Sequence, residues 1–220
     1  NRPATARASL PGACRKADGG VRHGLAQTPR EVVEAMKRLA TEMHNRDTPG
    51  RKYTNAPYIT HPAKVVEMLE SWGYSADEGS DAVILATAWG HDLLEDTKTT
   101  EEEIGNAGGI FGASLVNCIR ALTFDPGEAG KEERVRLKSL YIQTIAKSSR
   151  EIVVVKMADR LCNTLDFCAS GDPWAVEYLK LGAPLFERID ECKGSDRIRA
   201  TLEAVRRKVA ELQDYCSPES

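Results

Sequence analysis

Residues 82–97, AVILATAWGHDLLEDT, decide how this sequence is interpreted. The first half is apolar or small on nearly every side of a helix, which predicts a helix from Ala82 to about Glu95 that is buried in a helical core. Four ionisable residues end this segment, namely His91, Asp92, Glu95 and Asp96. On one continuous helix, His91 and Glu95 would share a face, and Asp92 and Asp96 would share the adjoining face.

These four groups need partners, because burying them unpaired would cost several kcal/mol. A divalent cation would satisfy them. The alternative is that they cap a helix end at the surface. Carboxylates at a helix C-terminus oppose the helix dipole, however, so capping explains Glu95 and Asp96 poorly. The segment therefore indicates a metal site.

The chain around this segment is helical in pattern almost throughout. Thr28-Pro29-Arg30-Glu31 combines a capping box with a proline in the first turn, which predicts a helix to about His44. His61-Pro62 opens a second helix, to about Trp72. Further helices are expected at 101–108 after a capping box at Thr100, and at 111–123, 131–147, 174–191 and 196–215.

One segment leaves two interpretations open. Residues 152–155, IVVV, could begin a strand, whereas the following MADRLCNTL has helical spacing up to Phe167. Strand signals elsewhere are weak, so the fold class is predicted to be all-α.

Composition limits the classes of function. The chain has 220 residues, a net charge of -3 and a pI near 5.9, so it lacks the basic footprint of a nucleic-acid-binding protein. The six cysteines form no CxxC pair, and most lie in helical apolar patterns, as free buried thiols do. No apolar run approaches the roughly 18 residues that span a bilayer. We expect a cytoplasmic protein with neither a nucleic-acid nor a membrane partner.

Residues 1–27 differ from the rest, because they are rich in Ala, Gly, Pro and Arg and contain one acid, Asp18. This composition predicts a disordered tail. A targeting peptide and a leader added by cloning are the alternatives. The domain is expected to span residues 28–216.

Two further segments carry the same kinds of residue as the central one. Tyr58-Ile59-Thr60-His61-Pro62 places a histidine where a helix begins, although a single histidine is more often structural than a ligand. Met157-Ala158-Asp159-Arg160-Leu161-Cys162-Asn163 follows the apolar run. A buried salt bridge between Asp159 and Arg160 is the alternative to a functional role there.

Together the three segments resemble a known family. PYITHP, HDLLEDT and KMADRLCN are similar to the motifs of the HD superfamily of metal phosphohydrolases, and especially to the hydrolase domain of RelA/SpoT-type alarmone enzymes of the short, stand-alone kind. TTEEEI and the later FG also resemble that family. The resemblance extends from about Glu31 to Phe167. It implies an HD-domain bundle of about eight to ten helices.

The resemblance also implies a site. His61, His91, Asp92 and Asp159 would hold one divalent metal, which in the family is manganese. Two imidazoles and two carboxylates also suit iron, cobalt or zinc. Glu95 and Asp96 match the catalytic acidic pair, which would orient or deprotonate water or manage the proton of the leaving group.

Three more residues match nucleotide contacts of the family, namely Arg51, Lys52 and Asn163. For Arg51 and Lys52 a solvated loop is the alternative. The family often has His or Tyr at the position of Cys162 and Arg at that of Leu165, so this chain departs from the pattern on the substrate side.

The implied function is hydrolysis of the 3′-pyrophosphate of guanosine tetra- or pentaphosphate, (p)ppGpp, to GDP or GTP and pyrophosphate. We expect a hydrolase without a synthetase domain. The departures at Cys162 and Leu165 leave open another nucleotide, such as NADPH at its 2′-phosphate, a dNTP or a cyclic nucleotide. A non-catalytic binding protein is the third interpretation. The sequence does not encode the oligomeric state.

Overall fold

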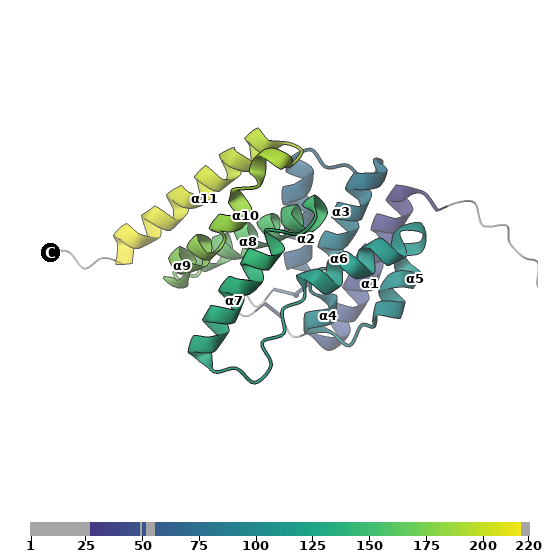
Figure 1. Cartoon of the computed structure of the whole chain (residues 1–220), viewed down its shortest axis with the longest axis horizontal. Coiled ribbons are helices and arrows are strands. Elements are labelled where there is room, and N and C mark those ends of the chain that lie inside the picture. Colours follow the sequence, from purple (N-terminus) through teal and green to yellow (C-terminus); the bar gives the residue numbers. More distant parts are fainter. Residues whose placement is uncertain (1–26, 49, 52–55, 217–220) are drawn as a thin grey trace, which may run out of the picture.

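The computed structural model describes residues 27–48, 50–51 and 56–216. The tail that we expect to be disordered, residues 1–27, lies outside the described part except for Gln27. Every regular element within it is helical (Figure 1). The elements are α1 Pro29–Asp47, α2 Thr60–Ser71, α3 Gly79–Gly90, α4 Leu93–Asp96, α5 Glu101–Gly108, η1 Gly109–Phe111, α6 Gly112–Leu122, α7 Lys131–Ile145, α8 Arg150–Ala169, α9 Trp174–Leu181, α10 Ala183–Phe186, η2 Ile189–Glu191 and α11 Ser195–Cys216.

The all-α prediction is confirmed. If the four-residue turns α4 and α10 are set aside, the number of α-helices among the described residues also agrees with the predicted eight to ten. None of the helices in this part of the chain is long and apolar enough to cross a membrane.

Two helix starts follow from local chemistry, as predicted. In the turn before α1, the Thr28 hydroxyl accepts a hydrogen bond from the Glu31 backbone N–H, and the Glu31 carboxylate accepts one from the Thr28 N–H. Thr100 and Glu103 form the same reciprocal pair before α5. Each pair satisfies backbone donors that a helix start would otherwise leave without partners.

The prediction of one continuous helix from Ala82 to Glu95 is wrong. The chain forms α3, then a turn at His91 and Asp92, then the short α4. Asp92 leaves helical dihedral angles, with φ -101° and ψ 0°. The apolar pattern does not indicate this break, because the pattern continues to Leu93, which is fully buried.

Gly90, at the end of α3, lies where neighbouring helices come close. A Cβ atom there would be 2.7 Å from Cδ1 of Ile119 and 2.8 Å from Cε of Met36. A larger residue there would require the ends of these two flexible side chains to shift. The glycine therefore lets side chains from α1 and α6 pack closely against the end of α3.

The open choice at residues 152–155 is settled in favour of a helix, because these residues lie in α8. Val153, Val154 and Val155 are each at most 1% exposed. The preference of β-branched residues for strands is weak, and burial against helices on several sides overrides it.

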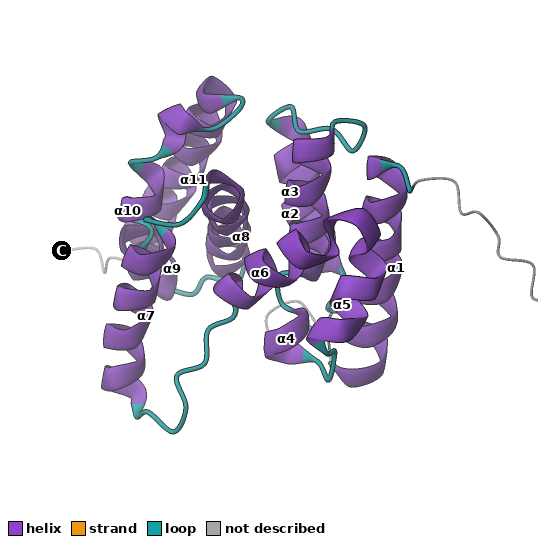
Figure 2. Ribbon diagram, turned by 45° about the vertical axis from the view of Figure 1, so that its right-hand side comes forward, coloured by secondary structure: helices purple, strands orange, loops and turns teal. Residues whose placement is uncertain are grey.

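Helix α8 is central to the packing. It contacts α2, α3 and α6 on one side and α9 and α11 on the other. Figure 2 shows the same arrangement, with α1 to α6 grouped on one side and α7 and α9 to α11 on the other. The start of α2, the end of α3 and the middle of α8 lie close together, and the predicted site residues come from these three places.

The described cysteines agree with the expectation of free thiols. Cys118, Cys162 and Cys192 are buried and Cys168 is partly exposed, and none of these four is in a disulfide. Cys14 lies outside the described residues.

Candidate metal centre

His61 enters the site from the first turn of α2. The Thr60 hydroxyl donates to the Pro57 carbonyl at 2.8 Å, which fixes the chain just before the histidine. The His61 ring is 1% exposed, and its Nε2 lies 3.1 Å from Oδ1 of Asp159. A buried imidazole that faces a carboxylate is a good candidate ligand.

His91 enters from the turn after α3. Its Nδ1 lies 2.7 Å from the Ala88 carbonyl, an acceptor only, so the proton of the neutral ring is on Nδ1. This leaves Nε2 as the atom that faces the centre, 3.2 Å from Oδ2 of Asp92 and 3.8 Å from Oδ1 of Asp159. That Nε2 is buried, yet it makes no hydrogen bond of acceptable geometry.

Asp159 lies on α8 between the two histidines and a lysine. Its Oδ1 faces both imidazoles, and its Oδ2 forms an ion pair with Nζ of Lys156 at 3.0 Å. Burial opposes ionisation, but the charge of Lys156 together with the interactions of His61 and His91 outweighs it and keeps the pKa of Asp159 well below its usual value. Asp159 is therefore a carboxylate that is already oriented toward the histidines.

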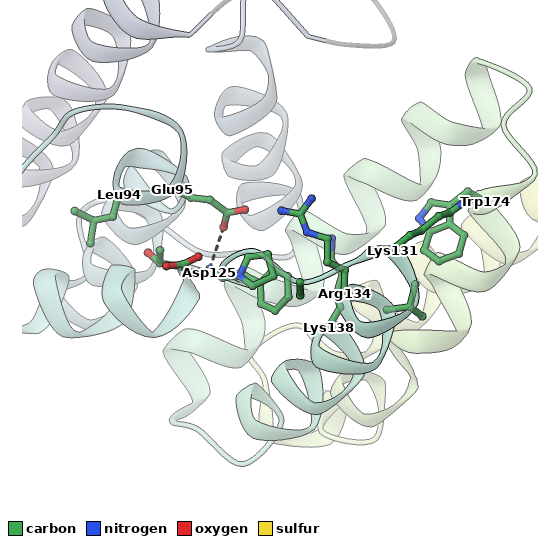
Figure 3. A pocket seen from close by; sticks show the side chains of 12 residues that line it. Leu94, Glu95, Asp125, Lys131, Arg134, Lys138 and Trp174 are labelled. Atoms are coloured by element: carbon green, nitrogen blue, oxygen red, sulfur yellow. Dashed lines mark hydrogen bonds between the residues drawn. The ribbon is translucent and has the colours of Figure 1, made fainter.

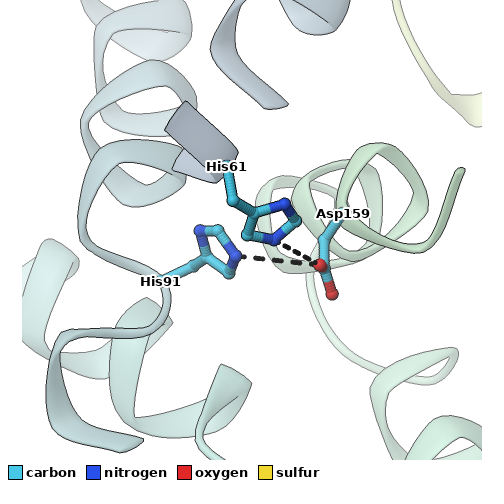
Figure 4. Close-up of side chains that lie close together, drawn as sticks. All are labelled: His61, His91 and Asp159. Carbon is cyan, nitrogen blue, oxygen red and sulfur yellow. Dashed lines mark hydrogen bonds and ion pairs between the residues drawn. The ribbon is translucent and has the colours of Figure 1, made fainter. Parts of the chain in front are cut away.

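The three buried donors form one cluster (Figure 4). One ligand atom each from His61, His91 and Asp159 lie within 4.8 Å of one another. Oδ2 of Asp92 adjoins them, 3.8 Å from Nε2 of His61. The structure thus brings together all four residues that the sequence predicted as ligands, from segments far apart in the chain.

The donor set fits a divalent transition metal. Imidazole nitrogens and carboxylate oxygens are its usual ligands, and the Nε2 of His91 lacks the hydrogen bond that a buried nitrogen needs. Without a cation, the charges of Asp92 and Asp159 outweigh the effect of burial and raise the pKa of His91 to about 10. A cation would replace the positive charge that this proton supplies.

Glu95 and Asp96, the predicted acidic pair, point in different directions. Oε2 of Glu95 accepts a hydrogen bond from the Phe124 backbone N–H at 3.0 Å, in the loop after α6. Asp96 accepts one from the Tyr58 hydroxyl, which also contacts Oδ2 of Asp92 at 2.8 Å. The face shared by His91 and Glu95 does not exist, because the helix is broken between them.

Both acids have altered proton affinity. Burial raises the pKa of Glu95, and the hydrogen bond from Phe124 only partly offsets this. Burial and the negative charge of Asp92 raise the pKa of Asp96, against the hydrogen bond from Tyr58. Carboxylates with raised pKa values accept protons more readily than exposed ones, as a general base must.

The predicted nucleotide contacts lie on one rim of the site. Arg51 donates to Oδ1 of Asn163 at 3.1 Å and forms an ion pair with Asp166, which Lys64 also contacts at 2.9 Å. The Arg51 side chain is only 10% exposed, so a freely solvated loop does not describe it. Lys52 lies outside the described residues.

The salt bridge considered between Asp159 and Arg160 is absent from the described contacts. Arg160 instead donates to the Tyr178 carbonyl at 2.6 Å, and its guanidinium lies 4.0 Å from the centre of the Tyr178 ring. Asp159 is therefore free to face the histidines.

Sequence reasoning gave no role to three residues at this site. Tyr58 was quoted in PYITHP and Lys156 in KMADRLCN, so their place beside predicted ligands was the available signal. His44, near the end of α1, stacks on Tyr58 with ring centres 4.6 Å apart. Burial lowers the pKa of His44 to about 4, so the ring is neutral at pH 7 and acts as an apolar support.

Two cavities meet at this site. A small cavity of about 120 Å³ lies over the cluster, and Arg51 and Asn163 help to line it. A larger one of about 1020 Å³ lies beside it, against the loop after α6 and the start of α7. Glu95, Phe124 and Lys138 line both cavities, which are therefore adjacent.

Comparison with known proteins bears on this geometry. Residues 36–189 match a family described as HD domain. A guanosine-3′,5′-bis(diphosphate) 3′-pyrophosphohydrolase of Danio rerio is 29% identical over 176 residues, which cover 79% of this chain and 88% of that protein. The protein of the same name from Xenopus tropicalis is 36% identical over 135 residues, which cover 61% of this chain and 68% of that protein.

A longer relative and a solved structure extend the comparison. A probable enzyme of the same name from Synechocystis sp. is 31% identical over 75% of this chain, which spans only 21% of that protein. A solved structure, described as a metazoan ortholog of SpoT that hydrolyzes ppGpp, matches with a TM-score of 0.57 and 23% identity. The match covers 84% of this chain and 94% of that one. At this identity, the likeness concerns the fold.

Proposed function

Because the chain belongs to the HD domain family, we propose that it is a metal-dependent phosphohydrolase that removes the 3′-pyrophosphate of (p)ppGpp. The products would be pyrophosphate and GDP or GTP. The observation that carries this proposal is the buried cluster of His61, His91 and Asp159 beside two carboxylates with raised pKa values. Relatives that cover most of this chain bear the name of this activity.

We assign one divalent cation, Mn²⁺, to His61, His91, Asp92 and Asp159. When bound, such an ion supplies positive charge that polarises the phosphate and makes an attacking water more acidic. The chain contributes ligands that are already oriented. The hydrogen bond to the Ala88 carbonyl keeps the proton of neutral His91 on Nδ1, and the ion pair with Lys156 orients the Asp159 carboxylate.

Glu95 and Asp96 would act on the attacking water. The water oxygen forms a bond to the phosphorus next to the ribose, and the bond from that phosphorus to the 3′ oxygen breaks. One carboxylate accepts the water proton, and a proton must reach the departing 3′ oxygen. The hydrogen bonds from Phe124 and Tyr58 hold the two side chains in place for these steps.

Arg51 and Asn163, which line the small cavity, would contact the nucleotide, and Lys52 is assigned there from the sequence alone. Arg51 is already held by Asp166, which lowers the entropy lost when it binds an anion.

The two departures from the family pattern do not favour a different substrate. Cys162 is 3% exposed and belongs to the hydrophobic core, and Leu165 packs against that core. Neither lines the cavity over the cluster.

A substrate panel tests the proposal. Metal-depleted protein is supplied with Mn²⁺ and incubated with ppGpp, NADPH, a set of dNTPs and a cyclic nucleotide, and products are separated by ion-exchange chromatography. We expect GDP and pyrophosphate from ppGpp, with little turnover of the others. Cleavage of another nucleotide while ppGpp stays intact would disprove the substrate assignment. No cleavage of any of them would favour a binding protein.

A further inference from the structure

The start of α7 carries a row of cations that packing does not explain. Lys131, Arg134 and Lys138 are spaced by three and four residues, so they lie on one face of the helix. Residues 131–136 are all exposed, and the buried residues of α7 lie near its other end. Lys131 and Arg134 therefore do not cover core surface.

Ion pairing separates this face from the rest of the helix. Arg136, on the other side, is paired with Glu133 at 2.6 Å. No ion pair is found for Lys131, Arg134 or Lys138 with any residue in the described part of the chain. Lys138 is partly buried, with Nζ 5.8 Å from the ring centre of Phe124 and 5.5 Å from that of Tyr178.

All three cations line the larger cavity (Figure 3). Its two acidic neighbours already have partners, since Glu95 accepts from the Phe124 N–H and Asp125 from the Gly127 N–H. Lys138 also lines the small cavity over the metal cluster, whereas Arg51 and Asn163 line only the small one. A cationic space thus opens on the side of the cluster away from the proposed nucleotide contacts.

We infer that the larger cavity contains a phosphate subsite in which Lys138, Arg134 and Lys131 bind the outer phosphate of the 3′-diphosphate. The inference rests on the proposed function. With the nucleoside on the Arg51 side and the inner phosphate at the cluster, the outer phosphate extends toward Lys138. Arginine and lysine are the residues that bind phosphate oxygens most strongly. The same contacts hold pyrophosphate after the bond to the ribose has broken.

Inorganic pyrophosphate is the probe for this subsite. Its binding to the metal-free full chain is measured by calorimetry, and its inhibition of turnover is compared with inhibition by GDP. We expect Lys138→Gln and Arg134→Gln to weaken pyrophosphate binding and inhibition by about tenfold or more, the loss of one charge-assisted hydrogen bond. Inhibition by GDP should stay the same.

Arg136→Gln is the matched control, since it removes a paired cation from the other face of the same helix. It should leave pyrophosphate binding unchanged. Lys138→Arg keeps the charge and should restore most of the binding, and thermal unfolding of each variant establishes that it is folded. Equal pyrophosphate binding in Lys138→Gln, Arg136→Gln and the original chain would overturn the inference. So would a loss of inhibition by GDP alone, because the cavity would then hold the nucleoside.

These results can be told apart from a failure of the proposed function. If ppGpp is not cleaved, the substrate assignment fails, but calorimetry still measures pyrophosphate on the original chain and on Lys138→Gln. Tenfold weaker binding in the variant would then support a phosphate subsite that serves another substrate. No binding of pyrophosphate to the original chain would overturn the subsite itself.

Discussion

The backbone N–H of Phe124 donates a hydrogen bond to Oε2 of Glu95 at 3.0 Å. The donor belongs to the loop after α6 and the acceptor to the short helix α4, so the bond ties two segments at the mouth of the site. Because a backbone group donates it, the orientation of the carboxylate does not depend on which side chain follows α6.

Glu95→Gln should slow turnover and leave the metal in place. The amide oxygen can still accept from Phe124, but an amide cannot take a proton from water. We expect kcat to fall by about 10²- to 10⁴-fold, the usual contribution of a positioned acid or base. Steady-state rates and metal content by mass spectrometry measure the two effects. Glu101→Gln, an exposed acid paired with Arg120, is the control. A variant at residue 95 with full rate would contradict the assignment.

Asp159→Asn should lose both metal and activity. The amide removes the negative charge that faces His61 and His91 and leaves Lys156 buried without its ion-pair partner. Removing one partner of a buried pair costs roughly 3–5 kcal/mol of unfolding free energy. Metal content and urea unfolding are the measurements.

Asp81→Asn separates the two effects of that change. Asp81 is 3% exposed and pairs with Lys193 at 2.7 Å, at the other end of α3 from His91. This control should lose stability and keep its metal. Normal metal content in Asp159→Asn would rule out Asp159 as a ligand.

The proposed ligands were assigned from the resemblance of three short motifs to the HD superfamily. Taken alone, His61 before a proline is more often structural, and Asp159 could have paired with Arg160, so the local patterns did not identify these two residues as ligands. The break between α3 and α4 was not predictable, because Leu93 continues the apolar pattern and the close approach at Gly90 arises only in the packed chain.

Residues that act through tertiary contact were missed for the same reason. Lys138 lies in an ordinary charged amphipathic segment, and only the folded chain places it beside Glu95. His44 supports Tyr58 across 14 positions of sequence through a stacked contact. No periodicity or local spacing indicates such a pair.

Asp166→Asn should weaken substrate binding more than it slows chemistry. Asp166 holds Arg51 and Lys64 without lining the cavity over the cluster, so it acts by positioning Arg51. We expect KM to rise by about tenfold with a small change in kcat, because an ordered cation becomes mobile. Arg51→Ala should raise KM too, and the double variant should be little worse than Arg51→Ala alone. Additive effects would show that Asp166 acts independently of Arg51.

Tyr58→Phe should move the acid side of the pH–rate profile to higher pH. Burial and the charge of Asp92 raise the pKa of Asp96, and the Tyr58 hydrogen bond lowers it. Without the hydroxyl the pKa of Asp96 rises further, so Asp96 becomes protonated at a higher pH when the solution is acidified. The ratio of the Tyr58→Phe rate to the rate of the original chain should therefore be lowest at acidic pH and become constant at alkaline pH. Tyr74→Phe removes a buried hydroxyl just beyond the other end of α2 and should leave the profile unchanged. An acid limb that stays in place or moves to lower pH in Tyr58→Phe would show that the hydroxyl does not stabilise the Asp96 carboxylate.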